Sequence, residues 1–524
     1  MHEIVTLQCG PNSNGIATHW WNLEIDSASN VHDEVRQSAL FESTTEGAVP
    51  RTIVIDHSIN MGDAVRMTHQ QPLGAFTSSV NEWQAHSRKT ALRRALGFDV
   101  PGPAPEPFRD AYFGQNTQPQ PSTTSTASEP TTKSDKWHQY ANFRLRPRQQ
   151  IALPTLETGA DFDIWPHGVT LCRDSYIDSV VDQVRWWAER CDSMQAIQLM
   201  ADSHNAFGGF ASEVAVTVKD EYERTSLVSI LASDTSDTAL RSRRAALSRA
   251  LTLRRIYDVS SAVVPLHATA PKTHVAHALA CVTAPIRSGK EVTWPFVLSR
   301  LKWRPANRIF ALSGAFVDSA KEHTLTQVFN LLPSQVEPRK YAPENDPSLP
   351  KDTILKSDNL SWEAEADPQA RTEWICASGL GALDGPSDDD YLRFMYLQKH
   401  LSRQPRADSS HTSALLGAFR SAHHYTSTNE TEEKTSGTIG EQQNDEVEDT
   451  FALCALTNSR AVARPLRKMA ETFARLTSGS QSALHHFRAD AGSHSVDDGA
   501  LGEDDIEDTR SALFDLVEDY EEHH

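Results

Sequence analysis

The chain has 524 residues, enough for about two to four domains with separate hydrophobic cores. Its formal net charge of −20 argues against a general affinity for DNA, RNA or anionic lipid surfaces, which are themselves negatively charged. The six cysteines include no CxxC pair, which excludes a zinc-ribbon or dithiol redox signature and favours unpaired thiols in a reducing compartment.

The sequence is expected to contain neither a membrane span nor a targeting segment of a recognised kind. No apolar run approaches the roughly 18 residues of a membrane-spanning helix. The N-terminal stretch MHEIVTLQCG carries an acidic residue, and the first arginine is Arg36. Neither a signal peptide nor a mitochondrial presequence has this composition.

Two segments near the N-terminus predict strands of a buried sheet. Residues 3–9 alternate like a strand, residues 10–15 break the pattern with glycine, proline and asparagine, and a helical run follows. Residues 51–56 form a short apolar run that ends in an acid, Asp56. The first segment is therefore a strand–loop–helix unit, and the second is a further strand.

The composition changes at residues 101–136, which are rich in proline, serine and threonine. This segment is predicted to be a disordered insertion. Order resumes at Trp137. Between Ser175 and Met194 apolar residues recur at helical spacing, which predicts a strongly amphipathic helix leading into the next strand.

Residues 196–232 organise the rest of the chain. They read as a short apolar run, AIQLMA, a polar loop with glycines, DSHNAFGGF, a helical pattern, and a second apolar run, SLVSILA. Strand, loop, helix and strand in this order form a βαβ unit, which predicts parallel strands. Ligands of parallel sheets bind beyond the carboxyl ends of the strands and over helix N-termini, where DSHNAFGGF falls.

The C-terminal half is predicted to contain a second α/β domain and helices. The second domain covers residues 266–424, with a long proline- and aspartate-rich loop at 333–372. Residues 425–450 are acidic and polar and predict a disordered linker. C-terminal helices are expected over 451–488 and an acidic tail over 489–524. Such a tail is either a solvated charge run or a docking arm, because it contains an apolar turn that could be buried on contact with a partner.

Several of these stretches together resemble a known family. MHEIVTLQCGPNSNGIATHWWNLE resembles the first strand, phosphate loop and first helix of tubulins, and PRTIVIDHS resembles their second-strand region. WHQYANFRLRPRQQIALP, the run from SYIDSVVDQVRWW to VKDEY, and RTSLVSILA resemble the Misato family, tubulin-related proteins of eukaryotes. The likeness is spread over residues 1–70 and 137–330 and depends on the order of these stretches, not on one short motif.

The resemblance implies an α/β fold of the tubulin/FtsZ type. A tubulin-like N-terminal segment, 1–100, and residues 137–265 would form a parallel-sheet domain of the nucleotide-binding type, followed by the second α/β domain, C-terminal helices and acidic tail. The family is associated with partitioning of mitochondria and inheritance of mitochondrial DNA, from the cytoplasm and the mitochondrial outer surface. The same locations are therefore expected here, with tubulin, a chaperonin or mitochondrial-surface proteins as partners, no nucleic-acid partner, and an oligomeric state left open.

The chain departs from tubulins in the loops that handle phosphate. Tubulins carry GGGTGSG at the central strand–helix turn, where glycines let the backbone approach a phosphate closely. This chain has NAFGGFA at residues 205–211, without the threonine. The tubulin loop GxLNxDxR, which supplies a catalytic acid to the neighbouring subunit's nucleotide, has no counterpart near residues 288–304. No catalytic residue is therefore predicted, and the chain is expected not to be an enzyme.

The candidate cofactor site is a vestigial nucleotide site formed by the first loop and the central loop. Its residues are Gln8, Gly10, Asn14, Asn205, Gly208 and Gly209. The resemblance implies GTP or GDP as its ligand, although the residues leave no cofactor certain. Two interpretations stay open: backbone N–H groups cradle a diphosphate, or the loops are a tight turn, a helix cap and a packed helix entry.

Two further groups of residues carry side chains suited to chemistry. Asp202 and His204 suit either acid–base chemistry or capping at a strand end, and no Ser or Cys nucleophile with a spacing signature accompanies them. The histidine pairs at 485–486 and 523–524 have no companion ligands at a recognised spacing, so no metal site is expected.

The sequence and the resemblance are compatible with three functions. The leading one is a non-enzymatic, tubulin-like protein involved in partitioning of mitochondria and inheritance of mitochondrial DNA. The first alternative is a polymerising GTPase of the tubulin/FtsZ type, which predicts turnover that rises with protein concentration. The second is a tubulin- or chaperonin-associated assembly factor.

Overall fold

The computed structural model describes the chain in stretches, with a few single residues between them. These stretches are 2–29, 39–44, 47–61, 136–139, 145–154, 162–234, 239–267, 272–288, 292–302, 306–317, 355–359, 371–378, 451–459, 462–478 and 501–521. The predicted disordered insertion, apart from Lys136, and the predicted linker 425–450 lie outside the described residues.

The centre of the molecule is a six-stranded sheet in which all neighbouring strands run parallel. In spatial order its strands are β5 (Gln150–Leu153), β4 (Thr52–His57), β1 (Glu3–Cys9), β6 (Met194–Asp202), β7 (Ser226–Ala232) and β8 (Ala262–Pro265). Almost every residue of β1 and β6 is buried, which explains their largely apolar sequences. The chain order reverses between β1 and β6, and ligands of such sheets bind at this switch point.

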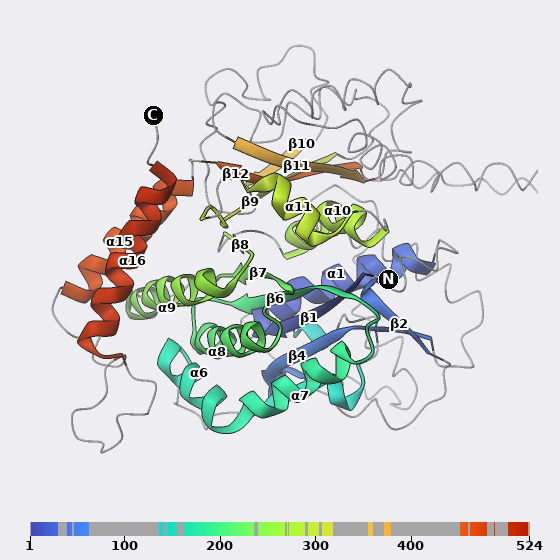
Figure 1. Cartoon of the computed structure of the whole chain (residues 1–524), viewed down its shortest axis with the longest axis horizontal. Coiled ribbons are helices and arrows are strands. Elements are labelled where there is room, and N and C mark those ends of the chain that lie inside the picture. Colours follow the sequence, from blue (N-terminus) through green and yellow to red (C-terminus); the bar gives the residue numbers. More distant parts are fainter. Residues whose placement is uncertain are drawn as a thin grey trace, which may run out of the picture.

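Helices cover both faces of this sheet (Figure 1). On one face lie α6 (Trp165–Leu171), the π-helical turn η5 (Cys172–Tyr176), α7 (Ile177–Ala188), α8 (Ala206–Glu221) and α9 (Ala239–Val259). On the other face lie α1 (Pro11–Ser29), α10 (Lys272–Ser288) and α11 (Trp294–Leu301). The predicted βαβ unit, β6–α8–β7, and the parallel α/β domain are thus confirmed. No helix within the described stretches combines the length and the apolar character needed to cross a membrane.

A second, antiparallel sheet lies beyond α10 and α11 (Figure 1). In spatial order its strands are β10 (Leu355–Asn359), β9 (Ala311–Val317), β12 (Phe451–Ser459) and β11 (Arg371–Ser378). Leu312 of β9 and Leu456 of β12 belong to the same hydrophobic core as α1 and α10. The two sheets therefore share the layer of helices between them.

Two strands of the second sheet correct the secondary structure expected from the sequence. β10 falls in the stretch 333–372, predicted to be a long loop, because its polar residues take strand geometry only through pairing with β9. β12 opens the stretch 451–488, predicted to be helical. Its apolar run suits a helix or a buried strand equally, and its partner β9 lies far earlier in the chain.

The C-terminal region is helical and belongs to the core. Helices α15 (Ala463–Ser478) and α16 (Glu503–Glu521) pack against each other and against α9 (Figure 1). Leu513 and Val517 of α16 are buried, and the Tyr520 hydroxyl accepts a hydrogen bond from the backbone N–H of Ile309 at 2.8 Å. Residues 501–521 of the acidic tail predicted over 489–524 are therefore not a free arm, since Leu513, Val517 and Tyr520 fall on one side of α16 and are buried there. In the apolar turn, Phe514 is 37% exposed.

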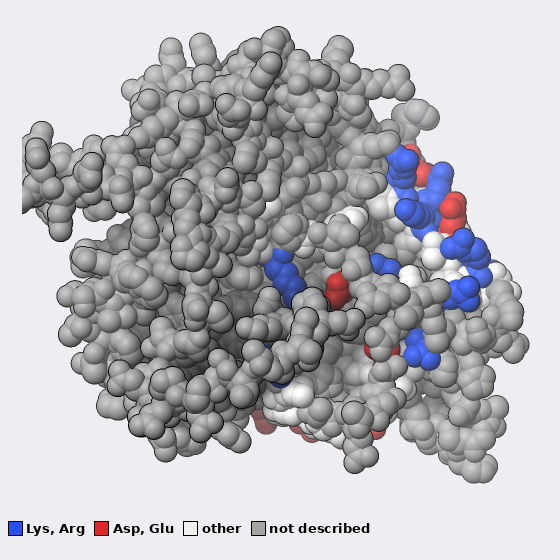
Figure 2. All heavy atoms as spheres, turned by 180° about the vertical axis from the view of Figure 1, so that it is seen from behind, with Lys and Arg blue, Asp and Glu red and all other residues white. Residues whose placement is uncertain are grey.

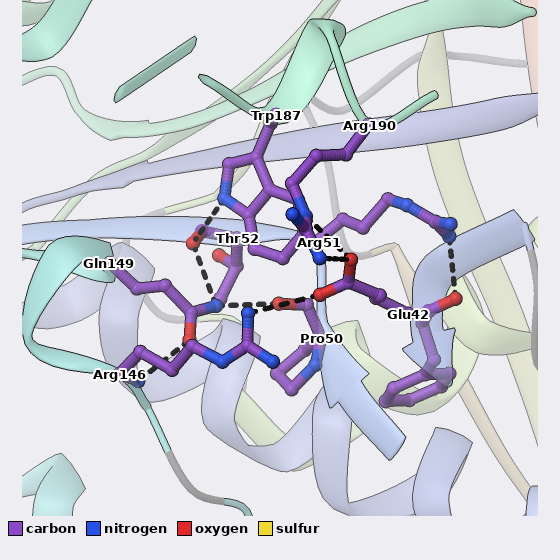
Figure 3. Close-up of polar contacts among 9 residues, drawn as sticks. Glu42, Pro50, Arg51, Thr52, Arg146, Gln149, Trp187 and Arg190 are labelled. Carbon is purple, nitrogen blue, oxygen red and sulfur yellow. Dashed lines mark hydrogen bonds and ion pairs between the residues drawn. The ribbon is translucent and has the colours of Figure 1, made fainter. Parts of the chain in front are cut away.

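A polar network joins the β2–β3 hairpin to its neighbours (Figure 3). The hairpin strands are β2 (Phe41–Thr44) and β3 (Gly47–Pro50), and Gln149 belongs to the short turn η4 (Pro147–Gln149), which leads into β5. Two further short turns, α3 (Ser58–Met61) and η3 (Trp137–Gln139), contact each other, and α3 directly follows β4. Glu42 forms ion pairs with Arg146, at 3.0 Å, and with Arg190. Gln149 Nε2 donates to backbone carbonyls at the end of β3 and the start of β4, at 2.6 and 3.2 Å. The buried Trp187 donates to the same carbonyl of β4 at 3.3 Å.

Candidate functional site

The two predicted loops meet at the switch point between β1 and β6. Gly10 directly follows β1 and has a backbone φ of +102°, a conformation that favours glycine. A Cβ atom at Gly10 would lie 2.7 Å from Cγ of Asp202, the last residue of β6. Gly10 is thus required both by its backbone conformation and by the close approach of the Asp202 side chain.

The Asp202 carboxylate occupies the N-terminus of α1. It accepts hydrogen bonds from the backbone N–H groups of Asn12, at 3.1 Å, and Ser13, at 2.7 Å. Pro11 has no N–H, and the N–H of Asn14 donates to the Gly10 carbonyl at 2.9 Å. The first turn of a helix normally presents such N–H groups to an anion. Here an internal carboxylate, contributed from 190 residues away along the chain, already accepts them.

The electrostatics of Asp202 follow from its burial. The residue has no exposed surface, and burial raises the pKa of its carboxyl group from 3.8 to about 7, while the hydrogen bonds from Asn12 and Ser13 lower it. The nearby carboxyl of Asp56 raises this pKa further, and the cation of Lys272 lowers it. A phosphate at the N-terminus of α1 would have to displace this carboxyl group or lie against it, because the same two donors would bind both.

The other two predicted residues near the first loop, Asn14 and Gln8, form hydrogen bonds inside the protein. Asn14 Nδ2 donates to the Asp56 carboxylate at 2.8 Å and to the Ile55 carbonyl at 3.2 Å. Asp56 also accepts from Trp137 Nε1 at 2.9 Å. Gln8 points along the sheet and donates to the hydroxyl of Thr52 at 2.9 Å. Asn14 and Gln8 therefore connect β1 and α1 to β4.

The central loop begins α8 and brings that helix close to its neighbours. The Asn205 side chain caps α8 by accepting from the backbone N–H of Phe207 at 3.0 Å. A Cβ at Gly208 would lie 2.2 Å from the hydroxyl of Thr252 on α9, and a Cβ at Gly209 would lie 1.9 Å from the Trp165 carbonyl oxygen on α6. The structure thus brings Gly10, Asn14 and Asn205 to one edge of the sheet, whereas both glycines of α8 serve helix packing.

Aromatic rings fill the part of this edge beside β4. The rings of Phe162, Phe207 and His57 pack edge to face, with centroids 5.0 to 5.1 Å apart. His204 lies on the other side of the loop, where burial lowers its pKa to about 4 and keeps the ring neutral. Across the part of the chain that the structure covers, no group of His, Cys, Asp or Glu side chains is arranged to hold a metal ion.

Comparison with known proteins places the two loops in two segments that match family models. Residues 2–94 match the model described as the Misato Segment II tubulin-like domain, and residues 128–293 match the model described as a tubulin domain. The chain is 28% identical to protein dml-1 of Neurospora crassa over 340 residues, 59% of this chain and 58% of that one. It is 24% identical to protein misato homolog 1 of Danio rerio over 257 residues, 42% of this chain and 43% of that one. The chain thus carries one segment that matches a Misato model and one that matches a tubulin model, and it is similar to proteins named Dml1 and misato homolog 1.

These matches confirm the resemblance and the tubulin-like α/β fold expected from the sequence. Protein dml1 of Aspergillus niger is 28% identical over 241 residues, 43% of this chain and 46% of that one. The chain spans about half the length of the curated relatives it matches. In this chain β1 and α1 lie in the Segment II match and Asp202 lies in the tubulin match, so the Asp202 hydrogen bonds join the two matched segments.

The sequence indicates Asp202 as a candidate residue but leaves its role open between acid–base chemistry and capping. Of the two interpretations, the structure shows capping, but the capped helix is α1 and not the helix that follows Asp202. No local pattern carries this information. The usable signal is the order of parallel strands, which places the end of β6 beside the end of β1.

Proposed function

We propose that this chain is a non-enzymatic, tubulin-like protein that serves the partitioning of mitochondria and the inheritance of mitochondrial DNA. It acts from the cytoplasm or the mitochondrial outer surface. Similarity to Misato and Dml1 proteins supports the cellular role. The observation that supports a non-enzymatic protein is the Asp202 carboxylate, which accepts the N–H groups that a phosphate would need at the N-terminus of α1.

The cellular role is tested by deleting the gene from its native host. The expected result is fragmented or unevenly distributed mitochondria and loss of mitochondrial DNA over successive divisions, both restored by the wild-type gene. Microscopy of the mitochondrial network and quantitative amplification of mitochondrial DNA measure the two effects. Normal networks with retained mitochondrial DNA in the deletion strain would contradict the proposal.

The absence of GTP chemistry is tested on the purified full chain. Denaturation and chromatography are expected to release far less than one guanine nucleotide per chain. GTP turnover per chain is expected to stay at background at every protein concentration, since a polymerising GTPase takes its catalytic acid from a neighbouring subunit. Stoichiometric GTP or GDP, with turnover that rises with protein concentration, would favour the polymerising GTPase instead.

Partner contacts form a further part of this proposal, with tubulin, a chaperonin or mitochondrial-surface proteins as the candidates. The outward side of α16 offers a surface of suitable charge, since Asp508, Asp515 and Glu518 are exposed there. Substitutions on this exposed side preserve the core, whereas removal of the whole tail would remove the buried residues Leu513 and Tyr520. Co-purification with tagged wild type and with Asp515→Lys or Glu518→Lys therefore tests an assembly-factor role.

A further inference from the structure

A cavity separate from the α1 N-terminus lies between α9 and α15. Its volume is about 390 Å³, within the range of small-molecule sites. One wall is a stripe of α9 that includes Arg249, and the opposite wall is a stripe of α15 with Arg464 and Lys468. The floor consists of the carboxyl ends of β6, β7 and β8, with Ser203 and Ser233. We call it the α9–α15 cavity.

The charge of the α9–α15 cavity is opposite to that of the chain. Three cationic side chains line it, and none of the described residues around it is acidic, although the whole chain carries a net charge of −20. Figure 2, which views the molecule from behind, shows Lys and Arg side chains gathered along the edge formed by α15. A concave basic surface on an acidic protein selects for anions.

Arg249, which lines the α9–α15 cavity, has only neutral hydrogen-bond partners among the described residues. Its guanidinium group donates to the Ala245 carbonyl at 3.3 Å and to the Ser233 hydroxyl at 3.2 Å, and both acceptors are neutral. Burial lowers the pKa of Arg249, and no acidic group among the described residues offsets this effect. Lys468 likewise has no carboxylate partner within the described stretches. A largely buried cation without a counter-charge is costly, and an anionic ligand in the cavity would relieve that cost.

We propose that the α9–α15 cavity binds a small phosphate monoester with an apolar body. Arg249 and Lys468 carry the phosphate recognition, since a planar guanidinium and an ammonium group together supply several charge-assisted hydrogen bonds. The hydroxyls of Ser203 and Ser233 lie beside them. The apolar body packs on Leu253 and Met469. This binding is independent of the proposed function, because it uses neither the N-terminus of α1 nor Asp202.

The test is calorimetric titration of the full chain with phenyl phosphate, with inorganic phosphate and phenol as comparison ligands. Saturable binding of phenyl phosphate is expected, with weaker binding of either comparison ligand. Arg249→Gln and Lys468→Gln are each expected to weaken binding by about tenfold or more, since each removes a charged hydrogen-bond donor. Arg243→Gln is the matched control, because Arg243 lies on α9, is exposed and is not among the residues around the cavity.

Two outcomes would overturn the proposal. One is the absence of saturable binding of phenyl phosphate by the folded wild-type chain. The other is binding that Arg249→Gln and Lys468→Gln leave unchanged, which would put the anion elsewhere, including at the α1 N-terminus. Lys468 is an exposed residue of α15, so its substitution keeps the test valid should Arg249→Gln impair folding.

Discussion

Gly209→Ala is expected to destabilise the protein by roughly 3 kcal/mol or more, because the new methyl group has no room. Its Cβ would lie 1.9 Å from the backbone oxygen of Trp165, and backbone atoms of a packed helix cannot rotate away. Gly168 of α6 makes the reciprocal approach, since a Cβ there would lie 1.7 Å from the Ala206 carbonyl oxygen. Helices α6 and α8 therefore cross at two glycines. Urea unfolding followed by circular dichroism measures the free-energy difference.

Gly208→Ala is the matched control for this prediction. A Cβ at Gly208 would first meet the Thr252 hydroxyl, at 2.2 Å, and a side-chain oxygen can rotate away more easily than backbone. Alanine also favours the helical conformation over glycine by about 1 kcal/mol, which offsets part of the strain. The cost at Gly208 is therefore expected to be clearly smaller. A negligible cost at Gly209 would contradict helix packing as its role, and equal costs at both positions would contradict the difference expected between a side-chain and a backbone contact.

Asp202→Asn is expected to change how stability depends on pH. Burial raises the pKa of Asp202 from 3.8 in the unfolded chain to about 7 in the folded protein. Between these pH values the folded state holds a proton that the unfolded state has released. The stability that this proton contributes is full below about pH 4 and is lost as the pH rises to about 7. Asparagine does not titrate, so this dependence disappears in the variant.

The expected size follows from the shift of the pKa. Relative to Asp202→Asn, the wild type should lose on the order of 4 kcal/mol of unfolding free energy between pH 4 and pH 7. Paired urea titrations across this range measure the difference and cancel the contributions of other titrating groups. Asp192→Asn, a change of an exposed acid just before β6, is the control and should run parallel to the wild type. Parallel curves for wild type and Asp202→Asn would contradict the burial of an ionisable Asp202.

At the candidate site, the sequence predicts where the backbone is approached closely but not which group approaches it. From the sequence, Gly10 and Gly208 are both positions where the backbone is expected to approach a phosphate closely. The structure explains Gly10 by its positive φ and by the Asp202 side chain, and Gly208 by the hydroxyl of Thr252 on α9. A glycine in a sequence indicates that another group packs closely against its backbone, but it does not identify that group. In this chain the approaching groups come from distant parts of the same protein.

For α16 and for the second sheet, local sequence patterns likewise did not show which residues would be in contact. The charges of α16 suggested a solvated segment, yet the spacing of Leu513, Val517 and Tyr520 put apolar residues on one buried side. The sequence predicts a helix where β12 lies, and an apolar run of its length suits a helix or a strand equally. Its strand geometry comes from pairing with β9 on one edge and β11 on the other. Neither partner lies close to it in the sequence.

The sequence by itself determined the strand segments β1, β4, β6 and β7 and the βαβ unit, because periodicity and apolar runs are local properties of a chain. The order of several such stretches carried the resemblance to tubulin-like proteins. Only the tertiary structure decided that Asp202 accepts the N–H groups at the start of α1, that α16 closes the core, and that Arg249 and Lys468 face one cavity. Each of these contacts joins elements far apart in the chain. Their geometry depends on strand order and helix packing, which leave no signature in either segment alone.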